Sequence, residues 1–322
     1  MAAILEVSGL TAAFPTPAGP ARVLDGVNFQ VQDGEILGIV GESGSGKTLT
    51  ALSVLGLLPA AARVLGGEIV YRGSNLLALD RRAMNRVRGE QMAMIFQNPR
   101  SSLNPLYRVE TTLAQVLRTH RRLRGDEARR VEIELLADVG LSDPARVLRR
   151  FPHELSGGMC QRVMIAYAIA SNPRLLIADE PTTALDVTVQ LQIIELLARL
   201  RQEHGLTLVL ITHNLSVVAE LCDRVLVMYL GRIVEEAPVL EIFDRPRHPY
   251  TVGLLGSRPS VHAGGSLRTI PGQVPDPRER PRGCAFHTRC AFAQELCATD
   301  APLPETVGDN HVVECHFWRE LA

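Results

Sequence analysis

Apolar runs alternate with amphipathic stretches along this chain, and the alternation predicts an α/β fold. Strands are predicted at residues 4–7, 27–31, 35–40, 175–178 and 206–211. An amphipathic helix predicted over 187–201 separates the last two strands. Strand, helix and strand in that order are typical of a parallel βαβ sheet.

Other parts of the chain are helical or form a hairpin in the prediction. A helix is predicted from Lys47 to about Leu58, where Pro59 stops it, and a hairpin over 224–237 that turns near Gly231. Residues 98–170 have a helical pattern, in which apolar positions alternate with charged ones. The charged neighbours Arg129, Arg130, Glu132 and Glu134 are predicted to form a solvated face without function.

Composition narrows the classes of protein. The chain has 322 residues, of which 46% are hydrophobic, enough for a large α/β domain and a smaller appendage. Its 34 basic and 35 acidic residues give a formal charge of −1, so no strongly basic surface favours DNA or RNA as a partner. We find no apolar run of the roughly 20 residues that a spanning helix needs, and no secretion signal. We therefore expect a cytoplasmic protein that reaches any membrane through partners.

One segment, residues 41–48, has the chemistry of a phosphate-binding loop. It fits G-x-x-x-x-G-K-[ST] and lies between a predicted strand and a predicted helix. Glycines let the backbone N–H groups point at phosphate oxygens, and the helix N-terminus adds partial positive charge. Lys47 is predicted to reach the β- and γ-phosphates of ATP, and Thr48 to bind Mg²⁺. The predicted ATP contacts are Gly41, Ser43, Gly44, Ser45, Gly46, Lys47, Thr48 and Leu49.

A second set of candidate residues follows apolar strands. The run 175–178 ends in Asp179 and Glu180, and the end of a strand is where an open α/β sheet binds its ligands. Asp179 is predicted to hold Mg²⁺, and Glu180 to act as the base for the water that attacks the γ-phosphate. His213 is predicted to contact the γ-phosphate, and Gln97 to reach Mg²⁺ or the attacking water.

A serine and two glycines open a further apolar helix. The sequence Leu-Ser-Gly-Gly-Met begins at Leu155, and such a helix N-terminus is again receptive to an anion. A second anion site beside a single phosphate-binding loop indicates that it serves a neighbouring molecule. The chain resembles the ABC transporter ATPase family over about residues 4–255, on motifs in this order: 41–48, Gln97, 155–159, Glu180, Asp186 and His213.

The resemblance implies an ABC-type P-loop nucleotide-binding domain with a RecA-like core, an antiparallel β subdomain and a helical subdomain. In that family two cassettes sandwich two ATP molecules. The residues implied to contact the ATP of the partner cassette are Ser156, Gly157, Gly158 and Met159. Asp186 would lie between the two sites, and Phe14 resembles the aromatic residue that stacks on adenine, although an insert at residues 15–20 follows it.

Several stretches are similar to those of the oligopeptide and dipeptide importer ATPases. They are residues 97–99, 102–105, 180–186 and 248–251, with Met159 in place of the usual glutamine. The similarity implies an ATP-hydrolysing importer subunit at the cytoplasmic face of the membrane, with the segment after Gln97 against the membrane subunits. The implied partners are a second, different ATPase subunit, two transmembrane permease subunits and an extracytoplasmic substrate-binding protein. Nickel and glutathione importers, an exporter ATPase and a soluble ABC protein are the alternatives.

The C-terminal part has a different composition. Prolines and glycines accumulate between residues 259 and 281, so we predict two domains, 1–255 and 256–322, with the helical subdomain at about 98–170. Four of the six cysteines, Cys284, Cys290, Cys297 and Cys315, lie in the second domain. They form no C-x-x-C, and their spacing alone leaves ordinary thiols and a metal site equally open.

The spacing of these cysteines resembles that of the tail of peptide-importer ATPases, in which such a set holds a [4Fe–4S] cluster. That resemblance favours a four-iron cluster. Structural zinc is the alternative, with His287, His311 and His316 as substitute ligands. Cys160 and Cys222 lie outside the tail and are predicted to be packing residues.

Overall fold

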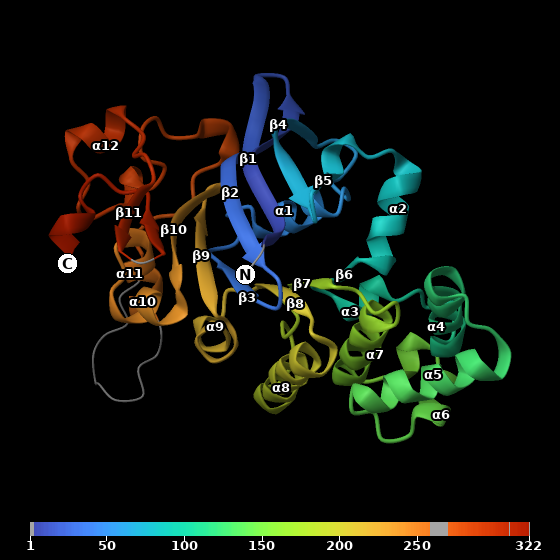
Figure 1. The fold of residues 1–322 in the computed structure, drawn as a ribbon. Coiled ribbons are helices and arrows are strands. Elements are labelled where there is room, and N and C mark those ends of the chain that lie inside the picture. The colour runs from blue at the N-terminus through green and yellow to red at the C-terminus, as the bar shows by residue number, and fades with distance from the viewer. Residues whose placement is uncertain (1–2, 258–269, 309, 322) are drawn as a thin grey trace. The chain divides into compact units, whose positions relative to one another are not determined.

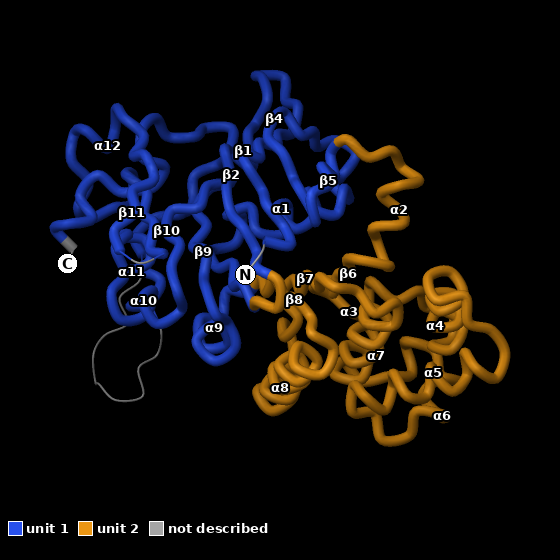
Figure 2. Tube along the Cα trace, in the orientation of Figure 1, with its two compact units in different colours: residues 1–32, 36–77, 212–322 blue, residues 33–35, 78–211 orange. Residues whose placement is uncertain are grey.

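The computed structural model describes residues 3–257, 270–308 and 310–321, so part of the proline- and glycine-rich stretch lies outside the described residues. Two compact units make up the chain (Figure 2). Unit 1 comprises residues 1–32, 36–77 and 212–322, and unit 2 comprises residues 33–35 and 78–211.

An antiparallel sheet begins unit 1, with its strands in the order β2-β1-β4-β5 (Figure 1). The strands are β1 (Ala3–Thr16), β2 (Gly19–Gln32), β4 (Arg63–Tyr71) and β5 (Ser74–Asn75). β1 and β2 are much longer than the strands predicted at 4–7 and 27–31, because their pairing continues to a hairpin in which Thr16 faces Gly19.

The other strands of unit 1 form a mixed arrangement. β3 (Ile36–Val40) is parallel to β9 (Arg224–Tyr229), and β9 forms an antiparallel hairpin with β10 (Arg232–Pro238). The hairpin predicted over 224–237 is confirmed. β10 also pairs with β12 (His311–Val313), which pairs with β11 (Glu305–Gly308). All residues of β3 are buried, as expected for an apolar parallel strand.

The helix that follows the phosphate-binding loop is α1 (Lys47–Val54), which ends earlier than predicted. Gly56 takes a φ of 58° and closes the helix before the following proline is reached. Its N–H donates to the carbonyl of Ser53 (3.0 Å), and the N–H of Leu57 donates to that of Leu52 (2.7 Å). This glycine-based C-cap satisfies the last carbonyl groups of the helix.

The remaining helices of unit 1 are short. They are α9 (Leu215–Leu221), α10 (Val239–Asp244), α11 (Pro249–Gly256) and α12 (Glu295–Thr299), with 3₁₀ turns η4 (Pro277–Glu279), η5 (His287–Arg289) and η6 (Trp318–Leu321). A further 3₁₀ turn, η1 (Leu76–Ala78), lies where unit 1 passes into unit 2 along the chain.

Unit 2 contains the predicted βαβ arrangement. β7 (Leu175–Asp179) and β8 (Thr207–Ile211) are parallel, with α8 (Val187–His204) between them in sequence, and β6 (Met92–Ile95) is parallel to β7. The other helical elements are α2 (Arg81–Glu90), α3 (Pro99–Ser102), α4 (Val109–Val116), η2 (Leu117–Arg121), α5 (Gly125–Asp138), α6 (Pro144–Leu148), η3 (Pro152–Glu154) and α7 (Gly157–Ile169). The helical pattern predicted for 98–170 is confirmed.

The charged face of α5 is not entirely solvated, and at Glu132 the prediction is wrong. Glu132 is 4% exposed, because α4 and α5 pack together. Its carboxylate accepts a hydrogen bond from Arg129 (3.3 Å), which also donates to Glu110 on α4 (3.0 Å). Burial raises the pKa of Glu132.

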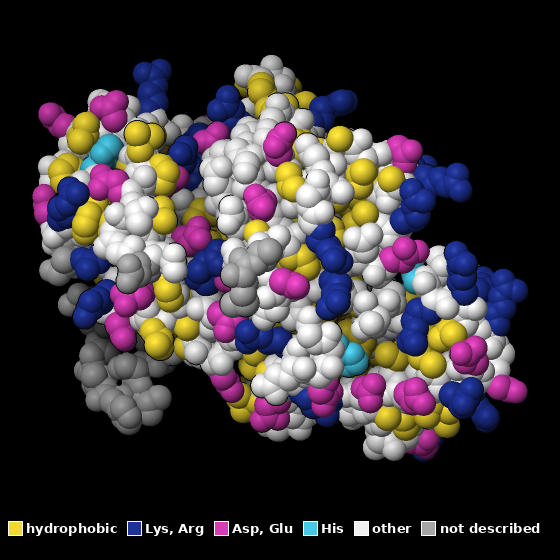
Figure 3. All heavy atoms as spheres, viewed as in Figure 1, with side chains coloured by type: hydrophobic (Ala, Val, Ile, Leu, Met, Phe, Trp, Pro, Cys, Tyr) yellow, Lys and Arg dark blue, Asp and Glu magenta, His cyan; other side chains and the backbone are white. Residues whose placement is uncertain are grey.

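Charges are mixed on the face of the molecule shown in Figure 3, where basic and acidic side chains are interspersed and hydrophobic ones are scattered. This mixture agrees with the formal charge of −1. Within the part of the chain that the structure describes, every helix is too short or too polar to cross a bilayer.

Candidate functional site

The predicted phosphate-binding loop joins β3 to α1 in unit 1. Gly41 and Gly46 both have positive φ, 154° and 104°. A Cβ atom on Gly41 would lie 2.2 Å from the carbonyl oxygen of Met228, so only glycine fits there. The N–H of Gly231 donates to the carbonyl of Ser45 (2.8 Å), which ties the loop to the turn between β9 and β10.

Lys47 opens α1 and is 6% exposed. Its Nζ donates to the carbonyl oxygens of Gly41 (2.7 Å) and Glu42 (2.9 Å), and contacts Ser45 Oγ at 3.4 Å. The backbone of the loop therefore holds the ammonium in place. An ammonium beside a helix N-terminus favours anions such as phosphate.

The other predicted ATP contacts of unit 1 differ in exposure. Phe14 is half-buried, opposite Ala21 near the tip of the β1–β2 hairpin, and the insert 15–20 forms that tip. His213 is exposed just after the end of β8. Leu49 is half-buried on α1. The exposed loop residues are Ser43, Gly44 and Thr48.

In unit 2 the structure brings Gln97 and Glu180 together, although they are 83 residues apart in sequence. Gln97 Nε2 donates to Glu180 Oε2 at 2.9 Å, and Thr183 Oγ1 donates to the same oxygen at 2.8 Å. Glu180 has a φ of 46°, which is uncommon for a residue other than glycine. Two donors thus orient a carboxylate just beyond the end of β7.

Two aspartates of unit 2 have different surroundings. Asp179, the predicted Mg²⁺ ligand, is the last residue of β7 and is 2% exposed. Asp186 caps α8, because its Oδ1 accepts the N–H of Val189 at 3.0 Å. The capping contact is internal to the chain, whereas the role predicted for Asp186 involves a second molecule.

The Leu-Ser-Gly-Gly-Met segment opens α7. Ser156 is exposed and caps the helix through a hydrogen bond from the N–H of Met159 (3.3 Å). A Cβ atom on Gly158 would lie 2.9 Å from Val189 Cγ1, whereas one on Gly157 would lie 3.8 Å from Leu185. Gly158 therefore allows α7 to approach the start of α8 closely.

The four cysteines of the C-terminal part line one cavity in unit 1, a question that their spacing alone left open. The side chains around it include Cys284, Cys290, Cys297 and Cys315, together with His248, His287 and His316. Burial raises the pKa of Cys284 to about 11 and that of Cys315 to about 12. Thiols in this environment stay protonated at neutral pH unless a bound cation favours the thiolate.

The histidines separate into two groups. His287 and His316 line the cysteine cavity, and so does His248, which the sequence did not nominate. His311 instead contacts Glu235 Oε1 through its Nε2 (2.8 Å) in a buried pair, so it is not a candidate metal ligand. Among the described residues, no group of three or more His, Cys, Asp or Glu side chains is arranged to hold a single metal ion.

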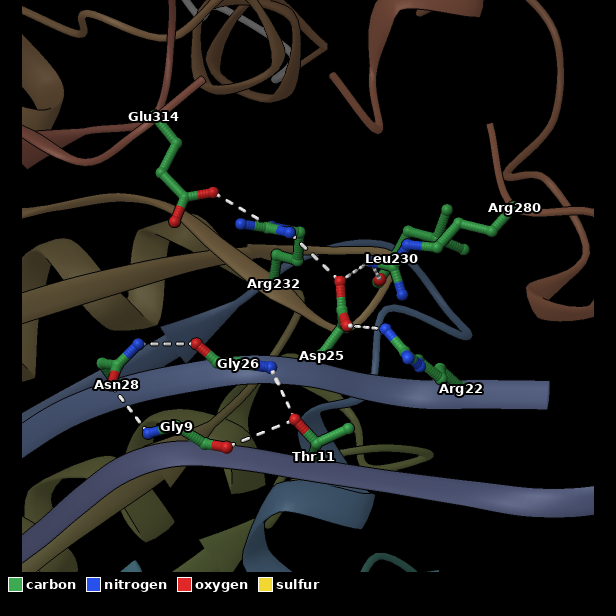
Figure 4. Close-up of polar contacts among 10 residues, drawn as sticks. All are labelled: Gly9, Thr11, Arg22, Asp25, Gly26, Asn28, Leu230, Arg232, Arg280 and Glu314. Atoms are coloured by element: carbon green, nitrogen blue, oxygen red, sulfur yellow. Dashed lines mark hydrogen bonds and ion pairs between the residues drawn. The ribbon is translucent and has the colours of Figure 1, made fainter. Parts of the chain in front are cut away.

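Ion pairs tie the C-terminal part to the rest of unit 1 (Figure 4). Arg232 on β10 donates to Asp25 (3.1 Å) and to Glu314 (3.2 Å), the residue before Cys315. Arg280 contacts the same Asp25 at 3.5 Å and donates to the carbonyl of Leu230 at 2.6 Å. Residues after 255 thus belong to the same compact unit as β3, and the boundary predicted there stays a prediction.

Thr183 and Tyr250 contact candidate site residues in a way that the sequence did not reveal. Thr183 belongs to the stretch 180–186, which was noted for its similarity to importers, but it was given no role. Tyr250 belongs to the stretch 248–251, which was noted for its similarity to importers but given no role. Its hydroxyl accepts the N–H of Glu42 in the phosphate-binding loop at 2.8 Å.

Comparison with known proteins gives matches in both halves of the chain. The ABC transporter family model matches residues 24–183, and the model described as oligopeptide/dipeptide transporter, C-terminal region, matches residues 234–297. A probable peptide ABC transporter ATP-binding protein of Sinorhizobium fredii is 49% identical over 319 residues, 98% of this chain and 95% of the relative.

Solved structures have a similar fold. The dimeric post-hydrolysis state of the ATP-binding cassette MJ0796, bound to ADP and phosphate, matches with a TM-score of 0.67 and 29% identity, over 73% of this chain and 98% of that one. CbiO1 of Clostridium perfringens, part of an ABC transporter complex, matches with a TM-score of 0.65 and 27% identity, over 76% and 92%. The predicted α/β cassette fold with a C-terminal extension is confirmed.

Proposed function

The chain belongs to the ABC transporter family of ATP-binding proteins, with the C-terminal region of oligopeptide and dipeptide transporters, and we propose that it is the motor subunit of a peptide importer. As a member of this family it binds and hydrolyses ATP. The observation that carries the proposal is the combination of the two matches in one chain: the cassette supplies ATP hydrolysis, and residues 234–297 match the C-terminal region of oligopeptide and dipeptide transporters.

The proposed chemistry uses positioning and charge. Lys47 and the N–H groups at the start of α1 bind the β- and γ-phosphates, and Thr48, Gln97 and Asp179 hold Mg²⁺ directly or through water. Glu180 polarises the attacking water. The support for that role is the pair of hydrogen bonds that fix its Oε2. His213 contacts the γ-phosphate, and Phe14 stacks on adenine.

A second cassette completes each site in this proposal. MJ0796, which has the same fold, was solved as a dimer with ADP and phosphate. Ser156 and Gly158 at the start of α7 contact the ATP bound by the partner cassette, and Asp186 lies at that interface. The exposed position of Ser156 at the start of α7 supports this role, because the N-terminus of a helix attracts phosphate.

The proposed location is the cytoplasmic face of the membrane, beside two permease subunits. A substrate-binding protein delivers the substrate to these permeases from the other side of the membrane. Leu106 is 80% exposed and Tyr107 49% exposed, both in the segment after Gln97. Two large apolar side chains in one exposed segment fit a surface that docks onto membrane subunits.

We also propose that the cysteine cavity holds a [4Fe–4S] cluster. Four cysteines are the ligand set of such a cluster, and all four line the cavity. A zinc ion would need its ligand atoms within about 2.3 Å of one point. Structural zinc stays the alternative. When bound, the cluster would hold the tail segments together through Cys284, Cys290, Cys297 and Cys315.

Purification and reconstitution test the transport proposal. The tagged chain is isolated from detergent-solubilised membranes, and the copurifying subunits are reconstituted in vesicles with their binding protein. We expect ATP-dependent uptake of labelled di- or oligopeptides, which the variant Glu180→Gln abolishes. Uptake of nickel or glutathione without peptides would identify a different importer, and recovery on ribosomes or DNA would contradict a transport role.

Metal analysis of anaerobically purified protein tests the cluster proposal. We expect about four irons and four sulfides per chain, with visible absorbance that Cys290→Ser removes. Cys160→Ser is the matched control, because Cys160 is buried in α7 and is predicted to leave the iron content unchanged. One zinc per chain without iron would refute the cluster.

A further inference from the structure

Arg289 joins the cysteine cavity to the phosphate-binding loop within unit 1. It ends η5, directly before Cys290, and its side chain is 4% exposed. Its guanidinium donates to both carboxylate oxygens of Glu42, Nη1 to Oε2 at 2.5 Å and Nη2 to Oε1 at 3.1 Å. The partners are 247 residues apart in sequence, so the contact exists only through the tertiary fold.

Glu42 is one of the two loop residues whose carbonyl oxygens accept hydrogen bonds from Lys47. It follows Gly41, and its carbonyl oxygen accepts a hydrogen bond from Lys47 Nζ at 2.9 Å. The N–H of the same residue donates to Tyr250 Oη at 2.8 Å. Arg289 therefore holds the side chain of Glu42, and Tyr250 holds its backbone. Rotation of this peptide would move an acceptor of the lysine that is proposed to bind phosphate.

Arg289 is itself fixed by its surroundings. Its Nε donates to the carbonyl of Pro271 at 2.9 Å, and the guanidinium lies over the ring of Tyr229, 5.8 Å from the centroid. The Tyr229 ring meets Phe286 edge-on with centroids 5.1 Å apart, and Phe286 lines the cysteine cavity. Planar bidentate pairing and stacking on an aromatic ring are uses to which arginine is suited and lysine is not.

A second set of contacts links the cysteine cavity to another residue of the loop. Glu314 precedes Cys315 and pairs with Arg232, as Figure 4 shows. Arg232 follows Gly231, whose N–H donates to Ser45 in the loop. The residues next to two of the four cysteines, Arg289 and Glu314, are thus linked to different residues of the loop.

We propose that Arg289 is a positioning residue for ATP binding: through its bidentate pair with Glu42 it sets the conformation of the phosphate-binding loop, and it makes that conformation depend on the segment around Cys290. The inference rests on the proposed ATP site at Lys47. Under this proposal the C-terminal part is not independent of the ATP site, because a structural change at Cys290 alters the phosphate-binding loop through the adjacent Arg289.

Equilibrium binding of mant-labelled ATP to the full-length chain tests the proposal, together with hydrogen exchange of peptides that cover residues 41–48. We expect Arg289→Met to weaken binding by about 5- to 150-fold, the usual range of coupling between two sites, and to speed exchange of the loop. Arg289→Lys should restore little, because an ammonium cannot form the bidentate pair.

The matched control is Arg278→Met. Arg278 also forms a bidentate pair in the tail, with Asp276 (3.0 and 2.5 Å), but that pair is exposed. We expect the Arg278→Met variant to have the same nucleotide affinity and the same rate of loop exchange as the unmodified chain. A loss of affinity as large as that of Arg289→Met would mean that any tail arginine has the effect, which would overturn the proposal.

A second route avoids dependence on one variant. Glu42→Gln removes the same pair from the loop side, and the double variant should be no worse than either single one. The charge-swapped pair Glu42→Arg with Arg289→Glu should recover part of the affinity. Fully additive losses would overturn the coupling. Cys290→Ser should also weaken mant-ATP binding when Arg289 is intact. When it is added to Arg289→Met, it should have no further effect on binding.

Lys47→Ala separates failure of this inference from failure of the proposed site. Suppose that Lys47→Ala loses mant-ATP binding, while Arg289→Met keeps its affinity within twofold of normal and its loop exchanges at the normal rate. The ATP site would then be supported and the role of Arg289 refuted. Normal binding in Lys47→Ala would refute the site assignment itself.

Discussion

At Glu180 two neutral donors, Gln97 Nε2 and Thr183 Oγ1, converge on one carboxylate oxygen. Two hydrogen bonds to the same oxygen fix the direction of the carboxylate. The positive φ of Glu180 is an uncommon conformation, which the bond from its N–H to the carbonyl of Ile211 (2.8 Å) helps to hold. These features suit a base that must be oriented toward a water molecule.

Replacing Glu180 by Gln should separate nucleotide binding from hydrolysis. We expect turnover to fall by roughly 10²- to 10⁴-fold, the usual contribution of a general base, while ATP still binds and the dimer accumulates on a sizing column. Glu134→Gln is the control, since Glu134 is exposed on α5. Normal steady-state ATPase activity of Glu180→Gln would assign the base to another residue.

At the scale of elements, the contact between α7 and α8 depends on a missing side chain. Ala in place of Gly158 would bring Cβ within 2.9 Å of Val189, whereas the neighbouring Gly157 has 3.8 Å to Leu185. Overpacking of this kind costs about 1–3 kcal/mol. We expect urea unfolding to show Gly158→Ala less stable than Gly157→Ala by about that amount.

Removing the obstacle should restore the stability of the overpacked variant. The loss of stability that Gly158→Ala causes should be much smaller in the Val189→Ala variant than in the unmodified chain. Equal unfolding midpoints for Gly157→Ala and Gly158→Ala would show that the helices adjust freely and that the glycine is not needed for packing. Stability, not ATPase activity, is the measurement, because both positions are proposed to face nucleotide.

The cap of α11 predicts a dependence on pH. His248 is 1% exposed, its Nδ1 accepts the N–H of Tyr250 (3.0 Å), and burial lowers its pKa to about 4. The unfolded chain binds a proton below about pH 6.5 and the folded chain does not until about pH 4. Stability is therefore lost as the pH falls through that window, by about 2 kcal/mol between pH 7 and pH 5.

Substitution isolates that contribution from other titrating groups. In His248→Asn an amide oxygen can replace the acceptor, and the proton-linked loss should disappear, so urea unfolding at pH 7 and pH 5 should differ less than in the unmodified chain. His204→Asn, at an exposed position at the end of α8, should retain the full dependence. An unchanged dependence in His248→Asn would exclude this histidine as its source.

At the scale of the molecule, the C-terminal part adds a strand, β12, beside β10. β12 pairs with β10, and Arg280 and Glu314 pair with Asp25 and Arg232. A chain that ends at Ser257 would expose the edge of β10, and exposed edges promote aggregation. We expect it to unfold at lower urea and to elute partly as aggregate, whereas full-length Cys290→Ser should stay monodisperse. A stable monomeric truncation would support the two domains predicted at residue 255.

Local signals determined much of this molecule. The loop at 41–48, the buried strands β3, β7 and β8, the hairpin at Gly231 and the motif at Ser156 could be predicted because each depends on neighbours in sequence: apolar runs, glycines and helix caps. Helix ends were less predictable. At α1 the choice between Gly56 and the proline after it depended on which carbonyl groups found donors.

The sequence by itself determined that the chain binds ATP and nominated the residues of the phosphate-binding loop, because such a loop is a local structure with a local pattern. Only the tertiary structure decided that four separated cysteines share a cavity, that His311 pairs with Glu235 instead of joining them, and that Glu132 is buried. It also decided that Arg289 reaches Glu42. These contacts join distant segments, and their energy depends on burial and geometry that spacing along the chain does not encode.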